Sequence, residues 1–419
     1  MTVGSAAAQT AQSELHRNAA TLNVGDDAFM MQYARAFYCN LPDDNNGIVI
    51  QARGWNNTTG ANNNQYRFPV TQIFDDVWAV GNHYVVQYMI KTPDGIVGVD
   101  SGNSATEFSR FNYPALQSLG LSSSYPLKAM FLTHGHGDHD GGAQWALDNV
   151  GTRSTIGSAD NTLGASAGKS YKPDFIDSTN LSMRTISIGG KQFWILPTPG
   201  HTPGSTSAVV EVTDWGKTRR VLINGGQSMT NSIPEVAQYL DSIERVYAMA
   251  SALNVDGVMT PHIYWDGEGA KLDEINATGR TNPGQHIYGH ETVMRMTAVA
   301  RECSAAWLTR LNATAVTPVW RFNTIEFMGN PTPTKVAARM KNGWNAVANK
   351  KVTFSVAETG ASCTALTDAD GVASCQVNPL RPHKDTLTAS FAGSESTDFV
   401  DLPAERSALV CSNGNCNAK

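Results

Sequence analysis

The chain has 419 residues, with 31 lysines and arginines against 37 aspartates and glutamates, which gives a formal net charge of −6. This length predicts two or three domains, with enough chain to bury a sizeable core. The acidic balance, without any Lys/Arg-rich run, argues against a nucleic-acid partner. No stretch approaches the roughly 20 apolar residues of a membrane span, and the N-terminus lacks the apolar core of a signal peptide.

The first 68 residues form an N-terminal extension that we expect to be partly disordered. Residues 1–25 are rich in Ala, Ser, Thr and Asn, which disfavours a packed core. Residues 26–38 predict a short helix, and the Asn- and Gly-rich stretch 40–65 predicts a loop or a lid.

From residue 69 to residue 330, strand and helix patterns alternate, which predicts an α/β domain. It opens with β-type runs over 70–80, 84–90 and 95–100, separated by turn residues. Further strand patterns cover about 128–132, 184–188, 191–196, 206–212 and 220–224, and helical patterns cover about 104–119, 142–149, 233–253 and 289–311.

A separate all-β domain is predicted for residues 331–419. Pro331 and Pro333 mark its start, and short alternating strands with turns between them predict a small β-sandwich. Within it, the stretch 367–375 is similar to the bacterial immunoglobulin-like modules found on exported proteins. That resemblance implies a spacer or adhesive module, which would contact a cell surface or a polymer.

Six cysteines allow 15 full pairings, and their spacing favours two of the pairs. One pair lies six residues on either side of Ala369, so its members are cross-strand neighbours if that segment is a hairpin. A second pair encloses a tight loop, and a third remains by elimination. Disulfides predict a secreted or periplasmic protein, whereas free thiols in a cytosolic protein are the alternative. The three candidate pairs are Cys363–Cys375, Cys411–Cys416 and Cys39–Cys303.

The most informative motif is His134-Gly-His136-Gly-Asp138-His139, which follows an apolar run predicted as a strand. Neutral imidazole and carboxylate groups suit Zn²⁺ at about 2.0 to 2.2 Å. The glycines let a short backbone fold around an ion without a Cβ clash. A polar surface loop with chance histidines is the alternative, but the compact pattern favours a metal site.

Two further histidines lie in motifs of their own. His201 lies in the Pro- and Gly-rich turn 198–205, and His262 lies in Met259-Thr-Pro-His-Ile263. Together with the His-x-His-x-Asp-His motif, these segments resemble the metallo-β-lactamase superfamily over roughly residues 69–312.

The resemblance implies an αβ/βα sandwich whose metal ligands gather at one edge of two sheets. It implies two Zn²⁺ ions as cofactors. It also implies that Asp100 orients a ligand histidine without binding the metal itself. The alternative is that Asp100 only stabilises the turn in which it lies. The implied ligands are His134, His136 and His201 for one ion, and Asp138, His139 and His262 for the other.

The sequence departs from many superfamily members at one metal ligand. Many superfamily members carry an aspartate that bridges both metals, but the matching stretch here reads Asn224-Gly225. This absence resembles the β-lactamase subclass with three-His and Asp-His-His sites. The serines that hold the substrate carboxylate in many members of that subclass are replaced by Gly225 and Gln227, which leaves the substrate open.

The resemblance implies a hydrolase in which a metal-bound hydroxide, oriented by Asp138, opens a cyclic amide or ester of a small molecule. A β-lactam is the first expectation and a lactone the second, and a sulfate-ester or phosphodiester hydrolase is a further alternative. Di-iron redox relatives usually replace a cluster histidine with Glu, whereas His134, His136 and His139 are all present. A non-catalytic exported binding protein is the remaining alternative.

Overall fold

The computed structural model describes most of residues 67–410 and, before them, residues 13–18, 20 and 39. The expectations for residues 26–38 and 40–65, and for the pair Cys411–Cys416, lie outside the described residues. Within the main range, the residues not described are 164–170, 172–173, 264, 282–284, 312–319, 322, 333–334, 344, 396–399 and 402–403.

The chain divides into two compact units. The first unit comprises residues 1–246 and 253–317, and the second comprises residues 247–252 and 318–419. The domain limits expected at residues 68/69 and 330/331 stay predictions.

A seven-stranded sheet opens the first unit, with its strands in chain order from β1 to β7. The strands β1 to β4 pair in antiparallel fashion, and the pairs from β4 to β7 are parallel. The run 70–80, expected as one strand, is instead a tight hairpin, because the chain reverses at Asp75 and Asp76 and pairs Phe74 with Val77. The strands are β1 (Thr71–Phe74), β2 (Val77–Gly81), β3 (Val86–Thr92), β4 (Gly95–Val99), β5 (Leu127–Phe131), β6 (Ser154–Gly157) and β7 (Asp174–Ile176).

A second sheet of five strands, in the order β12-β11-β10-β9-β8, packs against the first through a shared apolar core. Tyr88 and Val97 from the first sheet, and Val210 and Ile223 from the second, are fully buried in this core. Packing two sheets face to face leaves the strand ends on common edges, where loops from both sheets can meet. The strands are β8 (Arg184–Ile188), β9 (Lys191–Pro197), β10 (Thr206–Asp214), β11 (Lys217–Ile223) and β12 (Gly257–Met259).

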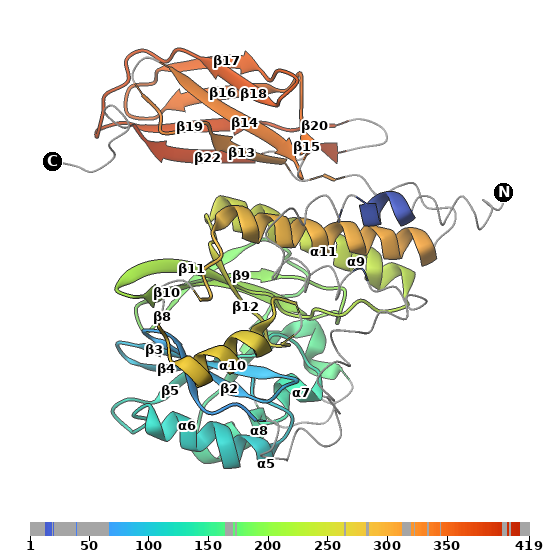
Figure 1. Ribbon diagram of the computed structural model, residues 1–419, viewed down its shortest axis with the longest axis vertical. Helices are drawn as coiled ribbons and strands as arrows, with labels where there is room; N and C mark the ends of the chain where they lie inside the picture. The colour runs from blue at the N-terminus through green and yellow to red at the C-terminus, as the bar shows by residue number, and fades with distance from the viewer. Residues whose placement is uncertain are drawn as a thin grey trace. The chain divides into compact units, whose positions relative to one another are not determined.

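Helices cover the outer faces of both sheets, which confirms the expected αβ/βα sandwich. Figure 1 shows α5, α6 and α8 beside the seven-stranded sheet and α9 and α11 beside the five-stranded sheet. The helix expected over 104–119 is interrupted by a π-helical turn, η2 (Phe108–Asn112). No described helix is both long and apolar enough to cross a bilayer. The helices are α5 (Ala105–Glu107), α6 (Tyr113–Ser118), α7 (Gly137–Asp140), α8 (Ala143–Val150), α9 (Ile233–Ala252), α10 (Glu268–Thr278) and α11 (His290–Leu311), with a 3₁₀ turn, η3 (Ser158–Thr162).

The N-terminal extension is tied to α11 at three described positions. Cys39 forms a disulfide with Cys303, as expected. His16 Nδ1 lies 2.6 Å from a carboxylate oxygen of Glu302, and the Ser13 hydroxyl donates to the Ala306 carbonyl at 3.0 Å. These contacts fasten the start of the chain to one helix of the first unit.

The second unit is all β, with two four-stranded sheets that share one apolar core. Cys363 and Cys375 form a disulfide, but the expected hairpin is wrong. Cys363 lies in β17, which pairs with β16, whereas Cys375 lies in β18, which pairs with β14 of the other sheet. The disulfide therefore links the two sheets, and the immunoglobulin-like assignment stays a prediction. The strands are β13 (Asn323–Phe327), β14 (Val336–Asn342), β15 (Asn345–Ala346), β16 (Lys351–Val356), β17 (Ser362–Leu366), β18 (Val372–Cys375), β19 (Thr386–Phe391), β20 (Ser394–Glu395), β21 (Val400–Asp401) and β22 (Ala404–Leu409).

Candidate metal centre

The ends of three strands bring the six predicted ligands together. The loop after β5 carries His134 and leads into α7, whose first turn carries Asp138 and His139. The turn between β9 and β10 carries His201, and the segment after β12 carries His262. The site thus takes ligands from both sheets, and the described residues contain two three-residue clusters of metal-ligand type. They are His134, His136 and His201, and Asp138, His139 and His262.

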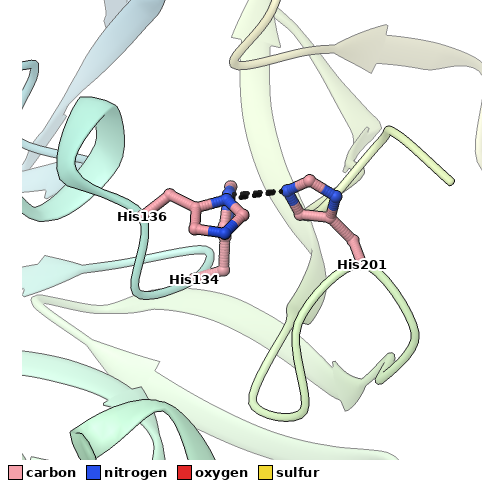
Figure 2. A group of neighbouring side chains, drawn as sticks. All are labelled: His134, His136 and His201. Carbon is pink, nitrogen blue, oxygen red and sulfur yellow. Dashed lines mark hydrogen bonds between the residues drawn. The ribbon is translucent and has the colours of Figure 1, made fainter. Parts of the chain in front are cut away.

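In the first cluster, three imidazole nitrogens converge on one point (Figure 2). His201 Nε2 lies 3.1 Å from His134 Nε2 and 3.0 Å from His136 Nδ1. On its other side, His201 donates from Nδ1 to the Ser228 carbonyl at 2.7 Å, so its Nε2 carries a lone pair when the ring is neutral. His136 is not fully buried, and the cluster is therefore accessible from solvent.

In the second cluster, two imidazoles and a carboxylate converge. His139 Nε2 lies 3.1 Å from His262 Nε2. Asp138 Oδ2 lies 3.6 Å from His139 Nε2 and 3.7 Å from His262 Nε2. The His134 and His139 rings lie 4.0 Å apart, centroid to centroid, so the two clusters are immediate neighbours.

These contacts are compatible with a shared metal ion. His139 donates from Nδ1 to Asp100 Oδ2 at 2.7 Å, and His262 donates from Nδ1 to the Tyr84 carbonyl at 3.1 Å. Neutral rings held in this way point two lone pairs at each other, which requires a proton or a metal ion between them. Zinc with tetrahedral Zn–N bonds of about 2.0 to 2.1 Å places its nitrogen ligands about 3.3 Å apart, close to the separations in both clusters.

Protonation is suppressed at three of these histidines. Burial lowers the pKa of His134 well below its ordinary value, and the neighbouring His139 adds to the effect. Burial, followed by His136, lowers the pKa of His201 to about 4. Burial, followed by His139, lowers the pKa of His262 to about 3. These rings are neutral at pH 7, which is the form that binds a metal.

The charges around His139 act in the opposite direction. Burial disfavours its charged form, but Asp100 and Asp138 together raise the pKa of His139. Burial likewise opposes ionisation of Asp138, but His139 and His262 keep the pKa of that carboxyl below its usual range. The second cluster therefore holds a carboxylate at neutral pH, whereas the first holds only imidazoles.

Asp100 lies directly behind His139. Besides its contact with His139, its Oδ1 accepts from the Thr133 backbone N–H at 2.7 Å. Its backbone φ of +57° lies in the left-handed region, which costs energy for a residue other than glycine. The contact and the strained backbone fit a residue that holds the His139 ring in orientation without binding the metal itself. This role of Asp100 stays a prediction.

The stretch that lacks a bridging aspartate is buried. The Asn224 amide oxygen accepts from the Ser207 hydroxyl at 3.1 Å, so it is used within the fold. A Cβ at Gly225 would lie 2.0 Å from the Thr206 carbonyl oxygen, which excludes a serine there in this backbone. Gln227 is 1% exposed. Neither Gly225 nor Gln227 offers an exposed hydroxyl to a substrate carboxylate.

Two buried features behind the ligands were not assigned from the sequence. Asp160 accepts hydrogen bonds from the loops of the first cluster. Behind His262 lies a set of charged and aromatic residues that we call the Lys271 group, linked to His262 through the Thr260 hydroxyl, which lies 2.7 Å from both Asp266 Oδ1 and the His262 carbonyl. Neither feature belongs to a ligand motif, and the contacts of both form only after folding. The members of the Lys271 group are Asp266, Glu268, Lys271, His286 and Tyr288.

Comparison with known proteins agrees with the resemblance seen in the sequence. A family model described as the metallo-beta-lactamase superfamily matches residues 80–216, which include β5, α7 and the turn that carries His201. The match lies within the first unit and confirms the resemblance of these residues to the metallo-β-lactamase superfamily, which supports a zinc-dependent hydrolase.

Solved structures similar to this chain are subclass B3 and other metallo-β-lactamases. BJP-1 of Bradyrhizobium japonicum is 23% identical, with 56% of this chain and 91% of that chain covered and a TM-score of 0.43. An enzyme from Cronobacter sakazakii is 22% identical, with 57% and 93% covered and a TM-score of 0.45. The native FEZ-1 enzyme of Legionella gormanii is 20% identical, with 55% and 92% covered and a TM-score of 0.43.

Proposed function

We propose that this protein is a dinuclear zinc hydrolase. His134, His136 and His201 would hold one Zn²⁺, and the cluster of Asp138, His139 and His262 would hold the second. The observation that carries the proposal is the adjacency of the two clusters, in each of which the ligand atoms lie within 4.8 Å of one another.

When bound, zinc lowers the pKa of a coordinated water from 15.7 towards about 7 and polarises a carbonyl oxygen. The chain's own contribution is to position and orient. Asp138 is an ionised acceptor at the front of the site, and the Tyr84 hydroxyl donates a hydrogen bond to it. We propose that Asp138 accepts a proton of the attacking water and directs the water's oxygen towards the substrate carbonyl.

For the substrate class, we propose a strained cyclic amide or ester, with β-lactams first. A lactone is the second candidate, and it is favoured by the lack of an exposed hydroxyl at the buried positions Gly225 and Gln227. A β-lactam carboxylate needs a donor from the protein, whereas a lactone ring carries no such charge. The absence of an exposed hydroxyl at either position therefore weakens the case for a β-lactam and not for hydrolysis itself.

The test is turnover by zinc-loaded protein of known metal content. We expect two equivalents of zinc, and hydrolysis of a chromogenic β-lactam or of members of a lactone panel that stops when a chelator removes the metal. Sulfate esters and phosphodiesters belong in the same screen. Turnover that survives complete zinc removal would refute the proposal, and stoichiometric iron without zinc would favour redox chemistry.

We also propose that the protein is secreted or periplasmic. The disulfides Cys39–Cys303 and Cys363–Cys375 support this proposal because such bonds persist in oxidising compartments. The second unit would then act as a spacer or contact a cell surface or polymer. Thiol mapping of protein from its native source tests the first point, and co-sedimentation with cell-wall polymer tests the second.

A further inference from the structure

A buried carboxylate lies between the two loops that carry the first cluster. Asp160 follows β6 on η3, and it is 0% exposed. Its Oδ2 accepts from the Gly135 backbone N–H at 2.8 Å and from the Thr202 hydroxyl at 2.6 Å. Its Oδ1 accepts from the Gly204 backbone N–H at 2.6 Å. Each of these donors lies within three residues of a histidine of the first cluster.

The donors are divided between the two sides of the cluster. Gly135 lies between His134 and His136, in the loop that follows β5. Thr202 follows His201 directly, in the turn between β9 and β10. One carboxylate therefore ties a loop of the first sheet to a turn of the second sheet at the level where their imidazole nitrogens meet.

Close packing reinforces this link on the same side of the site. A Cβ at Gly157, the last residue of β6, would lie 2.0 Å from the Gly204 carbonyl oxygen. Only glycine permits the end of β6 and the His201 turn to approach so closely. The Ser205 hydroxyl fixes the turn internally, 2.7 Å from the Thr202 hydroxyl.

We propose that Asp160 is a positioning residue for the first cluster, holding the loop 134–136 and the turn 201–204 at the separation that brings three imidazoles onto one ion. This inference rests on the proposed zinc function. A buried carboxylate is costly unless donors satisfy it, and all three donors come from segments that carry the ligands. Outer partners of this kind typically change metal affinity by about 10- to 100-fold when altered.

The first test replaces Asp160 by asparagine in the full chain. In D160N the amide NH₂ must face at least one of the N–H or O–H donors, so one side of the link is lost. We expect zinc affinity at the first cluster to fall about 10- to 100-fold, with the second cluster within about threefold of wild type. Competition with a chromophoric chelator measures both affinities, and a His262→Ala background isolates the first cluster. The matched control is D174N, because Asp174 is 57% exposed on β7.

Three outcomes overturn or limit the inference in different ways. Wild-type protein that binds fewer than two zinc ions refutes the proposed function. Wild type with two ions and D160N with unchanged affinity refutes the role of Asp160 alone. Equal weakening of both clusters, with a lowered melting temperature, also refutes it, because that pattern indicates general loss of structure.

A second pair of variants keeps the inference testable if D160N does not fold. T202V removes one hydroxyl donor, whereas T202S retains it. We expect weaker zinc binding at the first cluster in T202V and near-normal binding in T202S. In metal-free protein, the Gly135 and Gly204 amides should exchange faster in D160N than in wild type. Equal zinc affinity in T202V and T202S, or unchanged exchange in D160N, would contradict the proposal.

Discussion

The two clusters differ in charge and in how the fold holds them. The first consists of neutral imidazoles from two loops, and a buried carboxylate, Asp160, contacts the backbone of these loops and a hydroxyl. The second contains the carboxylate of Asp138, and another carboxylate, Asp100, contacts one of its imidazoles directly. The first cluster therefore depends on loop geometry, whereas the second depends on buried charge.

Buried charge also lies next to the segment that carries His262, a ligand of the second cluster. Lys271 Nζ lies 2.8 Å from both Asp266 Oδ2 and Glu268 Oε2, and all three residues are buried. Glu268 also contacts His286 at 2.9 Å. A compensated ionic group thus supports the end of β12, whereas backbone N–H groups and a hydroxyl surround the Asp160 carboxylate beside the His201 turn.

Removing one ligand from each cluster should give the largest effects. We expect H201A to lose tight zinc binding at the first cluster and H262A at the second. In each case the affinity should fall more than the roughly 100-fold upper range of outer-partner changes. Elemental analysis and zinc titration measure this, with circular dichroism as the folding control. If both variants lost the same ion, the division into two clusters would be wrong.

Breaking the Lys271 group should destabilise the first unit. K271M leaves Asp266 and Glu268 buried without their cation, and breaking a buried pair in this way costs about 3–5 kcal/mol. Urea unfolding measures the free energy of unfolding. The control K217M lies at the exposed end of β11 and should change stability by about 0.5 kcal/mol or less. A loss under about 1 kcal/mol in K271M would show that the group contributes little.

Lowering the pH should also destabilise the Lys271 group, because Glu268 becomes protonated. Burial opposes its ionisation, but His286 and Lys271 lower its pKa to about 2, from an ordinary 4.5. Because the folded pKa is the lower one, its stabilisation is complete above pH 4.5 and is lost as the pH falls towards 2. At 1.36 kcal/mol per pKa unit, this amounts to about 3 kcal/mol.

Melting temperatures between about pH 2 and pH 7 test this sign. The melting temperature of E268Q should fall less than that of wild type as the pH is lowered. E274Q, an exposed position on the same helix α10, should follow the wild-type curve. A wild-type limb that is flat between pH 4.5 and pH 2, or unchanged in E268Q, would contradict the assignment.

The smallest effect is expected from D100N, which tests whether Asp100 supports the second cluster and not the first. In D100N, the amide oxygen can still accept from Thr133 N–H, but its NH₂ then faces the His139 Nδ1–H. We expect zinc affinity at the second cluster to fall about 10- to 100-fold, towards the low end of that range, with the first cluster little changed. Chelator competition in an H201A background measures the second cluster alone. A loss confined to the first cluster would mean that Asp100 acts through Thr133.

Local sequence was informative where the chemistry is local. His134 to His139 lie within six consecutive residues, so their residue types and spacing indicated metal ligation, and the family resemblance added His201 in its Pro- and Gly-rich turn. The alternation of strand and helix patterns likewise predicted an α/β domain, and the family resemblance implied the sandwich. The expected hairpin between Cys363 and Cys375 failed because residue spacing does not say whether a turn reverses a strand within one sheet or crosses to another.

The sequence by itself determined which side chains are suited to hold metal and which family they resemble, because those properties reside in short motifs. Only the tertiary structure decided that the motif, His201 and His262 meet, since strands distant in the chain must first pack two sheets face to face. It alone also showed what Asp160 and the Lys271 group contact, because a carboxylate acquires its role from the donors that surround it after folding.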